Sequence, residues 1–204
     1  MSLDTTVGPR KGLRERVGQS RLGTLLVLAV TAVVVMAGAY MVDKPTETKA
    51  GGVTAVDVAP GDAPPPTIGK PAQDFTATTV DGKKVSLSSY KGHPVWLTFG
   101  ASWCAACVAE APDIQAAYQK HLPEGVVVLA INIREDSAAV GDYDKRVGLT
   151  FPTIADPDEA IASTYRIYGI PAHFFIDASG ILRLVKTGGQ SPAQMDAALK
   201  ETNR

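Results

Sequence analysis

Two cysteines, Cys104 and Cys107, have the residue type and spacing best suited to chemistry in this chain. They are the only cysteines among 204 residues, and an apolar run at residues 95–99 precedes them. We expect that run to be a strand leading into a helix that opens at Cys104. Free N–H groups and the positive dipole end at a helix N-terminus favour the nucleophilic thiolate. The pair is predicted to cycle between dithiol and disulfide, with this redox-active disulfide as its only cofactor.

Two other readings of the pair remain open. A structural disulfide across so short a loop removes little chain entropy, so it would stabilise the fold poorly. A structural zinc site usually takes four ligands, commonly two CxxC units or one CxxC with two histidines. The three histidines, His93, His121 and His173, have no such spacing. Redox chemistry is therefore the favoured interpretation, and no metal ligand is predicted.

The N-terminal region predicts a membrane anchor. Residues 22–42 carry no charge, and a helix of that length rises about 31 Å, enough for the hydrocarbon core. Residues 1–21 hold five basic and two acidic side chains, a net charge of +3. Since positive flanks stay cytoplasmic, the rest of the chain is expected outside the cell membrane. A signal peptide cleaved near the small residues 37–39 is the alternative.

The remainder divides into a linker and one domain. Residues 43–69 are rich in proline and glycine and are predicted to be a flexible tether, with a short strand at residues 53–58 as an alternative. Residues 70–204 suffice for a single hydrophobic core. The whole chain has net charge −1, which leaves −4 for residues 22–204. Nucleic-acid binding needs a basic face, so it is not expected.

The pattern along residues 70–204 predicts an α/β fold. Predicted strands cover residues 75–79, 84–87, 95–99, 126–133, 173–177 and 181–186. Predicted helices follow Cys104, cover residues 137–147, start at Pro157 and start at Pro192. Asp156 is expected to cap the third helix and Gly169 to end it, while Ser191 and Gln194 form a capping box. Pro112 is expected to kink the first helix. Together these elements describe helices packed on a mixed sheet.

At this point the sequence resembles the thioredoxin superfamily, and within it the TlpA/ResA-like membrane-anchored extracytoplasmic thiol-disulfide oxidoreductases. The resemblance covers about residues 70–204 and implies a thioredoxin-like fold. The segments that carry it are KPAQDF at 70–75, FGASWCAAC at 99–107, EAP at 110–112, FPT at 151–153 and YGIPAHFFID at 168–177.

The resemblance also implies roles around the cysteines. Pro171 would be a cis-proline against the disulfide, leaving the backbone of Ile170 free to pair with an extended client. Glu110, three residues after Cys107 on the same helical face, would take part in proton transfer. Trp103 and Glu110 would discriminate among clients. The alternatives are a trans proline that starts a strand and a solvated glutamate on a helix surface.

Two departures leave the direction of electron flow open. Thioredoxins proper carry a buried acid six residues before the first cysteine, and that place is Thr98 here. The residues between the cysteines help to set the redox potential. Ala105 and Ala106 bring no hydrogen bond of their own for a thiolate, which favours a reductase over a thiol oxidase.

The expected function is reduction of disulfides in exported client proteins. By resemblance the clients include apocytochromes c during cytochrome c maturation, with a membrane electron donor of the cytochrome-biogenesis type. A peroxiredoxin-like peroxidase is one alternative, but the Thr or Ser and the Pro expected three and seven residues before its cysteine are Ala101 and Leu97. A copper-delivery module is the other. It would use CxxxC and a distal histidine, for which His173 is the candidate.

Overall fold

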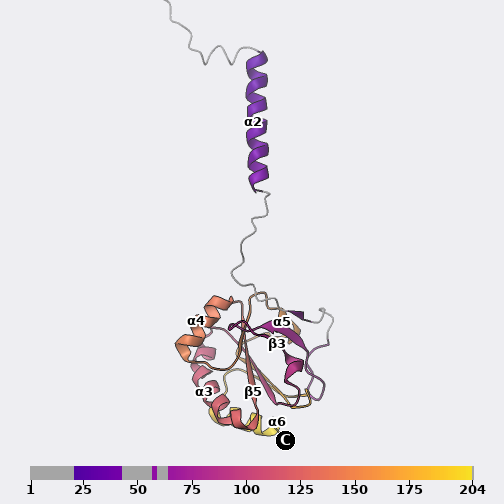
Figure 1. Cartoon of the computed structure of the whole chain (residues 1–204), viewed down its shortest axis with the longest axis vertical. Helices are drawn as coiled ribbons and strands as arrows, with labels where there is room; N and C mark the ends of the chain where they lie inside the picture. Colours follow the sequence, from indigo (N-terminus) through magenta and orange to yellow (C-terminus); the bar gives the residue numbers. More distant parts are fainter. Residues whose placement is uncertain (1–20, 43–56, 59–63, 204) are drawn as a thin grey trace, which may run out of the picture. The chain divides into compact units, whose positions relative to one another are not determined.

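The computed structural model describes residues 21–42, 57–58 and 64–203 (Figure 1). The predicted basic segment and most of the predicted linker lie outside these residues. The first described element is helix α2 (Arg21–Val42), which covers the uncharged run. Among the described residues, no helix combines the length and hydrophobicity required for a membrane crossing. The chain separates into two units, residues 1–50 and 51–204, and the second contains the cysteine pair.

A five-stranded mixed sheet forms the centre of the second unit. Its strands are β4 (Val95–Gly100), β5 (Val127–Ile133), β6 (Thr153–Asp156), β7 (Ala172–Ile176) and β8 (Leu182–Thr187), in the order β6-β5-β4-β7-β8. β4, β5 and β6 run parallel, while β7 and β8 pair antiparallel. The α/β prediction is confirmed, and β4, the strand that leads to the cysteines, lies at the middle of the sheet.

Hydrophobic cores cover both faces of this sheet. Along β4, Leu97 and Phe99 pack on one face, whereas Trp96 packs on the other. This alternation follows the two-residue period of a strand, and it explains why β4 is apolar throughout. In Figure 1, α3 and α4 lie on one side of β5, and α5 lies with β3 on the other.

A smaller antiparallel sheet precedes the main one. It contains β1 (Asp57–Val58), β2 (Phe75–Thr78) and β3 (Lys84–Ser86), in that order. β2 and β3 form the predicted hairpin, with Gly82 in the left-handed conformation at φ 87°. β1 pairs with β2 inside the predicted linker, at the end of residues 53–58, where a short strand was the alternative. The main sheet is joined to this one through an isolated bridge between Thr79 and Ile154.

Helices α3 (Ala105–His121), α4 (Ser137–Val147), α5 (Ala160–Thr164) and α6 (Pro192–Thr202) complete the unit, with short 3-10 turns at Leu87–Tyr90 and Leu122–Glu124. α3 continues through Pro112 as one helix. The capping box at α6 is confirmed, because Ser191 accepts from the backbone of Gln194 and the Gln194 side chain accepts from Ser191 N–H.

The predicted bounds of α5 are wrong at both ends. Asp156 is the last residue of β6, and its buried carboxylate reaches across a turn to accept N–H groups of Ile161 and Ala162. At the other end Arg166, not Gly169, adopts the left-handed conformation, at φ 54°. The N–H of Ile167 then bonds to Ala162 O at 2.9 Å, which closes the helix five residues early.

Candidate active site

The reactive pair lies where β4 meets α3. Cys104 is the N-cap of α3, and its Sγ accepts a hydrogen bond from Cys107 N–H at 3.2 Å. The two residues form a disulfide, with their Cα atoms 5.2 Å apart. Cys104 is 9 % exposed and Cys107 is 6 % exposed. The helix N-terminus therefore acts most directly on Cys104, as expected of an attacking thiolate.

The proline loop meets the cysteine pair through strand pairing. Phe99 pairs with Ala172 in the antiparallel ladder of β4 and β7. Continuing that register sets Pro171 opposite Gly100. A Cβ placed on Gly100 would lie 3.5 Å from Cys107 Sγ, so Gly100 is the close neighbour of the disulfide. The peptide bond between Ile170 and Pro171 is cis, as the resemblance implied.

Two predicted client-contact residues flank this point with different exposure. Trp103, immediately before Cys104, is 55 % exposed. Ile170 is partly buried and packs against the core on the β2 side of the sheet. Trp103 is therefore free to contact another protein, whereas Ile170 offers mainly its backbone.

Glu110 is buried below the cysteines instead of being solvated. Its side chain is 6 % exposed, and Oε2 accepts the backbone N–H of Gln190 at 3.0 Å. Glu110 and Cys107 both line a small cavity of about 30 Å³ under the start of α3. The prediction that the two residues share a face is confirmed, and the alternative of a surface glutamate is wrong.

The other walls of this cavity include Thr98 from β4, Asn132 from β5 and Tyr143 from α4. Burial raises the pKa of the Tyr143 hydroxyl, and the negative charges of Asp144, Glu135 and Glu110 add to that rise. Tyr143 therefore stays protonated and neutral throughout the physiological range. Within residues 64–203, Glu110 is the one carboxylate that lines the cavity.

His173 approaches the second oxygen of Glu110. Its ring is fully buried in β7, and Nε2 lies 3.4 Å from Oε1 of Glu110. No hydrogen bond forms across that contact, and Nε2 has no hydrogen-bond partner among the described residues. On the other side of the ring, the indole N–H of Trp96 donates to Nδ1 at 3.3 Å.

A second carboxylate holds the loop that carries the cysteines. Glu135, at the end of β5, is 8 % exposed. Its carboxylate accepts the backbone N–H of Ser102 at 2.8 Å and also the Ser102 hydroxyl. These contacts fix the turn just before Trp103 and Cys104.

Three participants were missed by the sequence analysis: Glu135, Gln190 and the pairing of His173 with Glu110. His173 gave a usable signal, because an ionisable side chain within the buried strand AHFFI needs a polar partner. Gln190 acts through its backbone, which no residue pattern reveals. Glu135 comes just after the C-terminal end of β5, as Cys104 comes after that of the parallel strand β4. This position was the only sequence signal that placed Glu135 near the cysteines.

Metal binding finds no support in the described part of the chain. Among those residues, no group of three or more His, Cys, Asp or Glu side chains is arranged to hold an ion. His173, the candidate copper ligand, is enclosed between Trp96 and Glu110.

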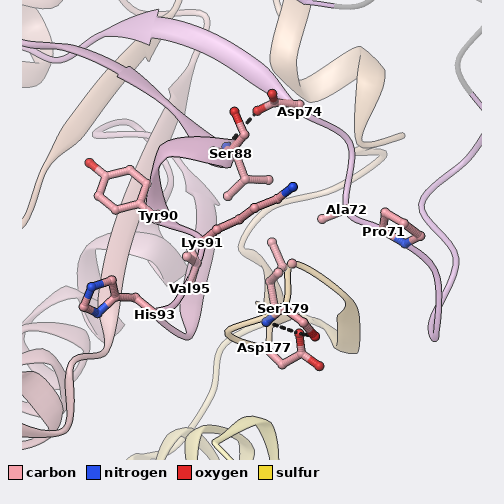
Figure 2. Close-up of a pocket in the computed structure, with 13 residues that line it drawn as sticks. Pro71, Ala72, Asp74, Ser88, Tyr90, Lys91, His93, Val95, Asp177 and Ser179 are labelled. Carbon is pink, nitrogen blue, oxygen red and sulfur yellow. Dashed lines mark hydrogen bonds between the residues drawn. The ribbon is translucent and has the colours of Figure 1, made fainter.

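A separate hollow of about 230 Å³ opens near the other end of β4 (Figure 2). Its two carboxylates already have partners. Asp74 accepts the N–H of Ser88, and Asp177 accepts both the N–H and hydroxyl of Ser179. The cysteines do not line it, so the reactive groups belong to the smaller cavity below α3.

Comparison with known proteins agrees with this geometry. Residues 68–185 match the AhpC/TSA family. The thiol-disulfide oxidoreductase ResA of Bacillus thuringiensis (strain Al Hakam) is 34 % identical over 134 residues, which are 66 % of this chain and 78 % of that protein.

Solved structures give the same result. A thiol:disulfide interchange protein of the thioredoxin family from Chlorobium tepidum TLS is 34 % identical, with a TM-score of 0.60 over 69 % of this chain and 98 % of the other. A secreted Mycobacterium tuberculosis disulfide oxidoreductase homologous to E. coli DsbE is 28 % identical. Its TM-score is 0.56, over 62 % of this chain and 94 % of the other.

Proposed function

Because the chain belongs to the AhpC/TSA family of thioredoxin-like proteins and is a thiol-disulfide oxidoreductase, we propose that it reduces disulfides of exported client proteins. The observation that carries the proposal is the disulfide between Cys104 and Cys107 at the start of α3, beside the Ile170–Pro171 bond. This is the state in which a reductase is left after each turnover.

The geometry supports a two-step exchange. The Cys104 thiolate attacks one client sulfur, the client disulfide breaks, and the other client sulfur leaves as a thiolate that takes up a proton. Cys107 then gives its proton to Glu110 and attacks Cys104 Sγ. The mixed disulfide breaks, and the second client sulfur leaves as a thiolate that takes up a proton from water, so that the client departs as a dithiol. Glu110 returns its proton to water, and the enzyme holds the Cys104–Cys107 disulfide. Two electrons have passed from enzyme to client, and a membrane electron donor of the cytochrome-biogenesis type restores the dithiol.

Client capture is assigned to the surface around Cys104. Trp103 supplies an exposed aromatic face next to the attacking sulfur. The backbone of Ile170 pairs with an extended client segment as an added strand would. Backbone pairing reads little client sequence, so Trp103 contributes more to client choice.

The cellular setting is the finer part of the proposal and rests on sequence and relatives. The uncharged residues 22–42, with the positively charged segment before them, support a single-pass anchor with the catalytic domain outside the cytoplasm. The choice of apocytochrome c as a client rests on the resemblance of the sequence to the TlpA/ResA-like oxidoreductases, and the relatives add that proteins similar to this chain are named thiol-disulfide oxidoreductases.

A redox titration combined with a client assay tests the proposal. The purified full-length chain is equilibrated with glutathione couples, and its reduced form is mixed with an oxidised peptide carrying the haem-binding CxxCH sequence. A potential below that of glutathione and rapid peptide reduction are expected, with Cys104→Ser as the inactive control. A potential well above that of glutathione would instead identify an oxidase. Peroxide consumption faster than peptide reduction would favour the peroxidase alternative.

A further inference from the structure

His173 is a buried ionisable side chain that has no part in the exchange steps proposed above. It is 0 % exposed, and Nε2 is one of three buried side-chain nitrogen or oxygen atoms without a hydrogen bond in the described part of the chain. A buried polar atom without a partner destabilises the folded state. Buried polar atoms without a hydrogen bond are uncommon in native proteins, so this one needs an explanation.

The contact with Trp96 fixes which nitrogen of His173 carries the proton. An indole N–H can only donate, so Nδ1 accepts and has no proton of its own. A neutral imidazole with an unprotonated Nδ1 carries its hydrogen on Nε2. That hydrogen is on the side of the ring that faces Glu110, 3.4 Å from Oε1.

The contacts of Glu110 leave one oxygen for this donor. Oε2 is held by the N–H of Gln190 at 3.0 Å. Oε1 lies 3.4 Å from Nε2 of His173. Glu110 therefore accepts a hydrogen bond from the backbone of Gln190, while in the disulfide form the side chain of His173 is near but not hydrogen-bonded to it.

We propose that His173 is a positioning residue for Glu110 in thiol-disulfide exchange. Its Nε2–H, held on that nitrogen by Trp96, closes on Oε1 when the pair is reduced and stabilises the carboxylate that takes the Cys107 proton. His173 thereby sets the pH range in which the second step of exchange proceeds. The inference rests on the proposed part of Glu110 in that step.

Few other groups titrate around this carboxylate. Cys107 of α3 and Tyr143 of α4 line the same cavity, and Thr98 and Asn132 line it without titrating. Glu135, in the loop after β5, and Asp144, within α4, act on Tyr143. The loop before α6 contributes only the backbone of Gln190. Changes at His173 should therefore appear mainly through Glu110.

The test follows the thiol–disulfide equilibrium of the full-length chain with glutathione from pH 5 to pH 9. No client is needed, so failure here and failure of the client assay are separate results. Reduction places a new thiol beside Glu110, so the carboxylate binds protons differently in the two redox states and the pH curve bends. His173→Leu removes the donor and should move that bend upward by about one pH unit, a tenfold change in protonation.

Matched variants separate positioning from packing. His173→Gln places an amide N–H near the Nε2 position and should restore the wild-type curve. Glu110→Gln should abolish the bend that the carboxylate contributes and leave the bends from thiol ionisation, and adding His173→Leu to it should change nothing further. If His173→Leu does not fold, Trp96→Phe provides a second test. It removes the indole donor, so the proton of His173 is no longer confined to Nε2, and the bend should move in the same direction by a smaller amount.

Three results would overturn the proposal. They are a His173→Leu curve superimposed on the wild type, equal shifts with leucine and glutamine, and a shift that persists in the Glu110→Gln background. If only Trp96→Phe folds, an unchanged curve overturns it as well.

Discussion

Helix α3 makes a histidine–carboxylate contact near each end, and the two contacts are built differently. Near its N-terminus, buried Glu110 faces buried His173 across 3.4 Å without a hydrogen bond. At its C-terminus, His121 is nearly as buried, but both ring nitrogens reach carboxylates. Nδ1 lies 3.1 Å from Glu124 and Nε2 lies 2.9 Å from Asp196.

The difference separates a structural contact from a reactive one. Both carboxylates around His121 are partly exposed, so water shares their charge, and Lys120 also binds Asp196. This C-terminal cluster, composed of Lys120, His121, Glu124 and Asp196, is closed and joins α3 to α6. Glu110 and His173 are shielded from water, and no hydrogen bond joins them yet. Their contact can therefore change when the charge on the neighbouring thiols changes.

The largest expected effect comes from the cysteines at the N-terminal end of α3, whose substitution should change activity and not the C-terminal cluster. Cys104→Ser should lower client reduction by at least about 1,000-fold, since the nucleophile is lost. Cys107→Ser should instead accumulate a mixed disulfide between Cys104 and client, visible on non-reducing gels. The C-terminal cluster should be unaffected, as judged by denaturant unfolding of the reduced proteins. Mixed disulfides that form only with Cys104→Ser would reverse the assigned roles.

Next in size is the loss of the closed contact. His121→Leu removes two hydrogen bonds to charged groups and should lower the free energy of unfolding by about 2–3 kcal/mol. Client reduction per folded molecule should stay unchanged, because no reacting atom touches the cluster. Exposed His93 provides the control, and His93→Leu should change stability by less than about 0.5 kcal/mol. Equal effects from the two variants would contradict the assignment.

A smaller effect is expected where α6 begins, between the two regions. Ser191 caps α6 directly after Gln190, which binds Glu110, and five residues before Asp196. Ser191→Ala should lower the free energy of unfolding by about 1 kcal/mol. Ser191→Asp keeps an oxygen for the cap and should match the wild type. Urea unfolding of the three proteins measures both effects, and a loss with aspartate equal to that with alanine would exclude capping as the cause.

The smallest effect concerns pH. Lys120, and after it His121, hold the pKa of Asp196 below its usual range, and His121 does the same for Glu124. A depressed carboxylate pKa contributes stability that is present above the unfolded value, about 3.9 for Asp, and is lost as pH falls through the folded value. Unfolding experiments should therefore give the wild type a higher free energy of unfolding than Asp196→Asn at pH 5 to 7. The difference should disappear below about pH 3. A difference that grows on acidification would contradict this sign.

The sequence allowed most elements to be predicted, because their signals are local. The bounds of α4 and the capping box at α6 follow from periodicity and cap residues within a few positions. The α5 bounds failed because Asp156 caps across a turn from a strand, and because Arg166 adopts a conformation usually left to glycine.

The site was predictable only where its residues are neighbours in sequence. Cys104, Cys107 and Glu110 share the first turns of one helix, so spacing sufficed to place them together. The contact of Glu110 with His173 spans 63 positions and depends on how β7 aligns with β4, where Thr98 pairs with His173. Spacing within a segment carries no information about that register.

The backbone contact from Gln190 to Glu110 also bears on the order in which the active site is completed. A ribosome releases the chain from its N-terminus, so the cysteines and Glu110 emerge some 80 residues before Gln190. Until the last segment folds, a nascent chain holds both thiols but not the donor that fixes the carboxylate between them and the sheet. The loop before α6 must therefore be in place before Glu110 is held, and a chain that stopped before residue 190 would carry the CxxC motif without the backbone donor to Glu110.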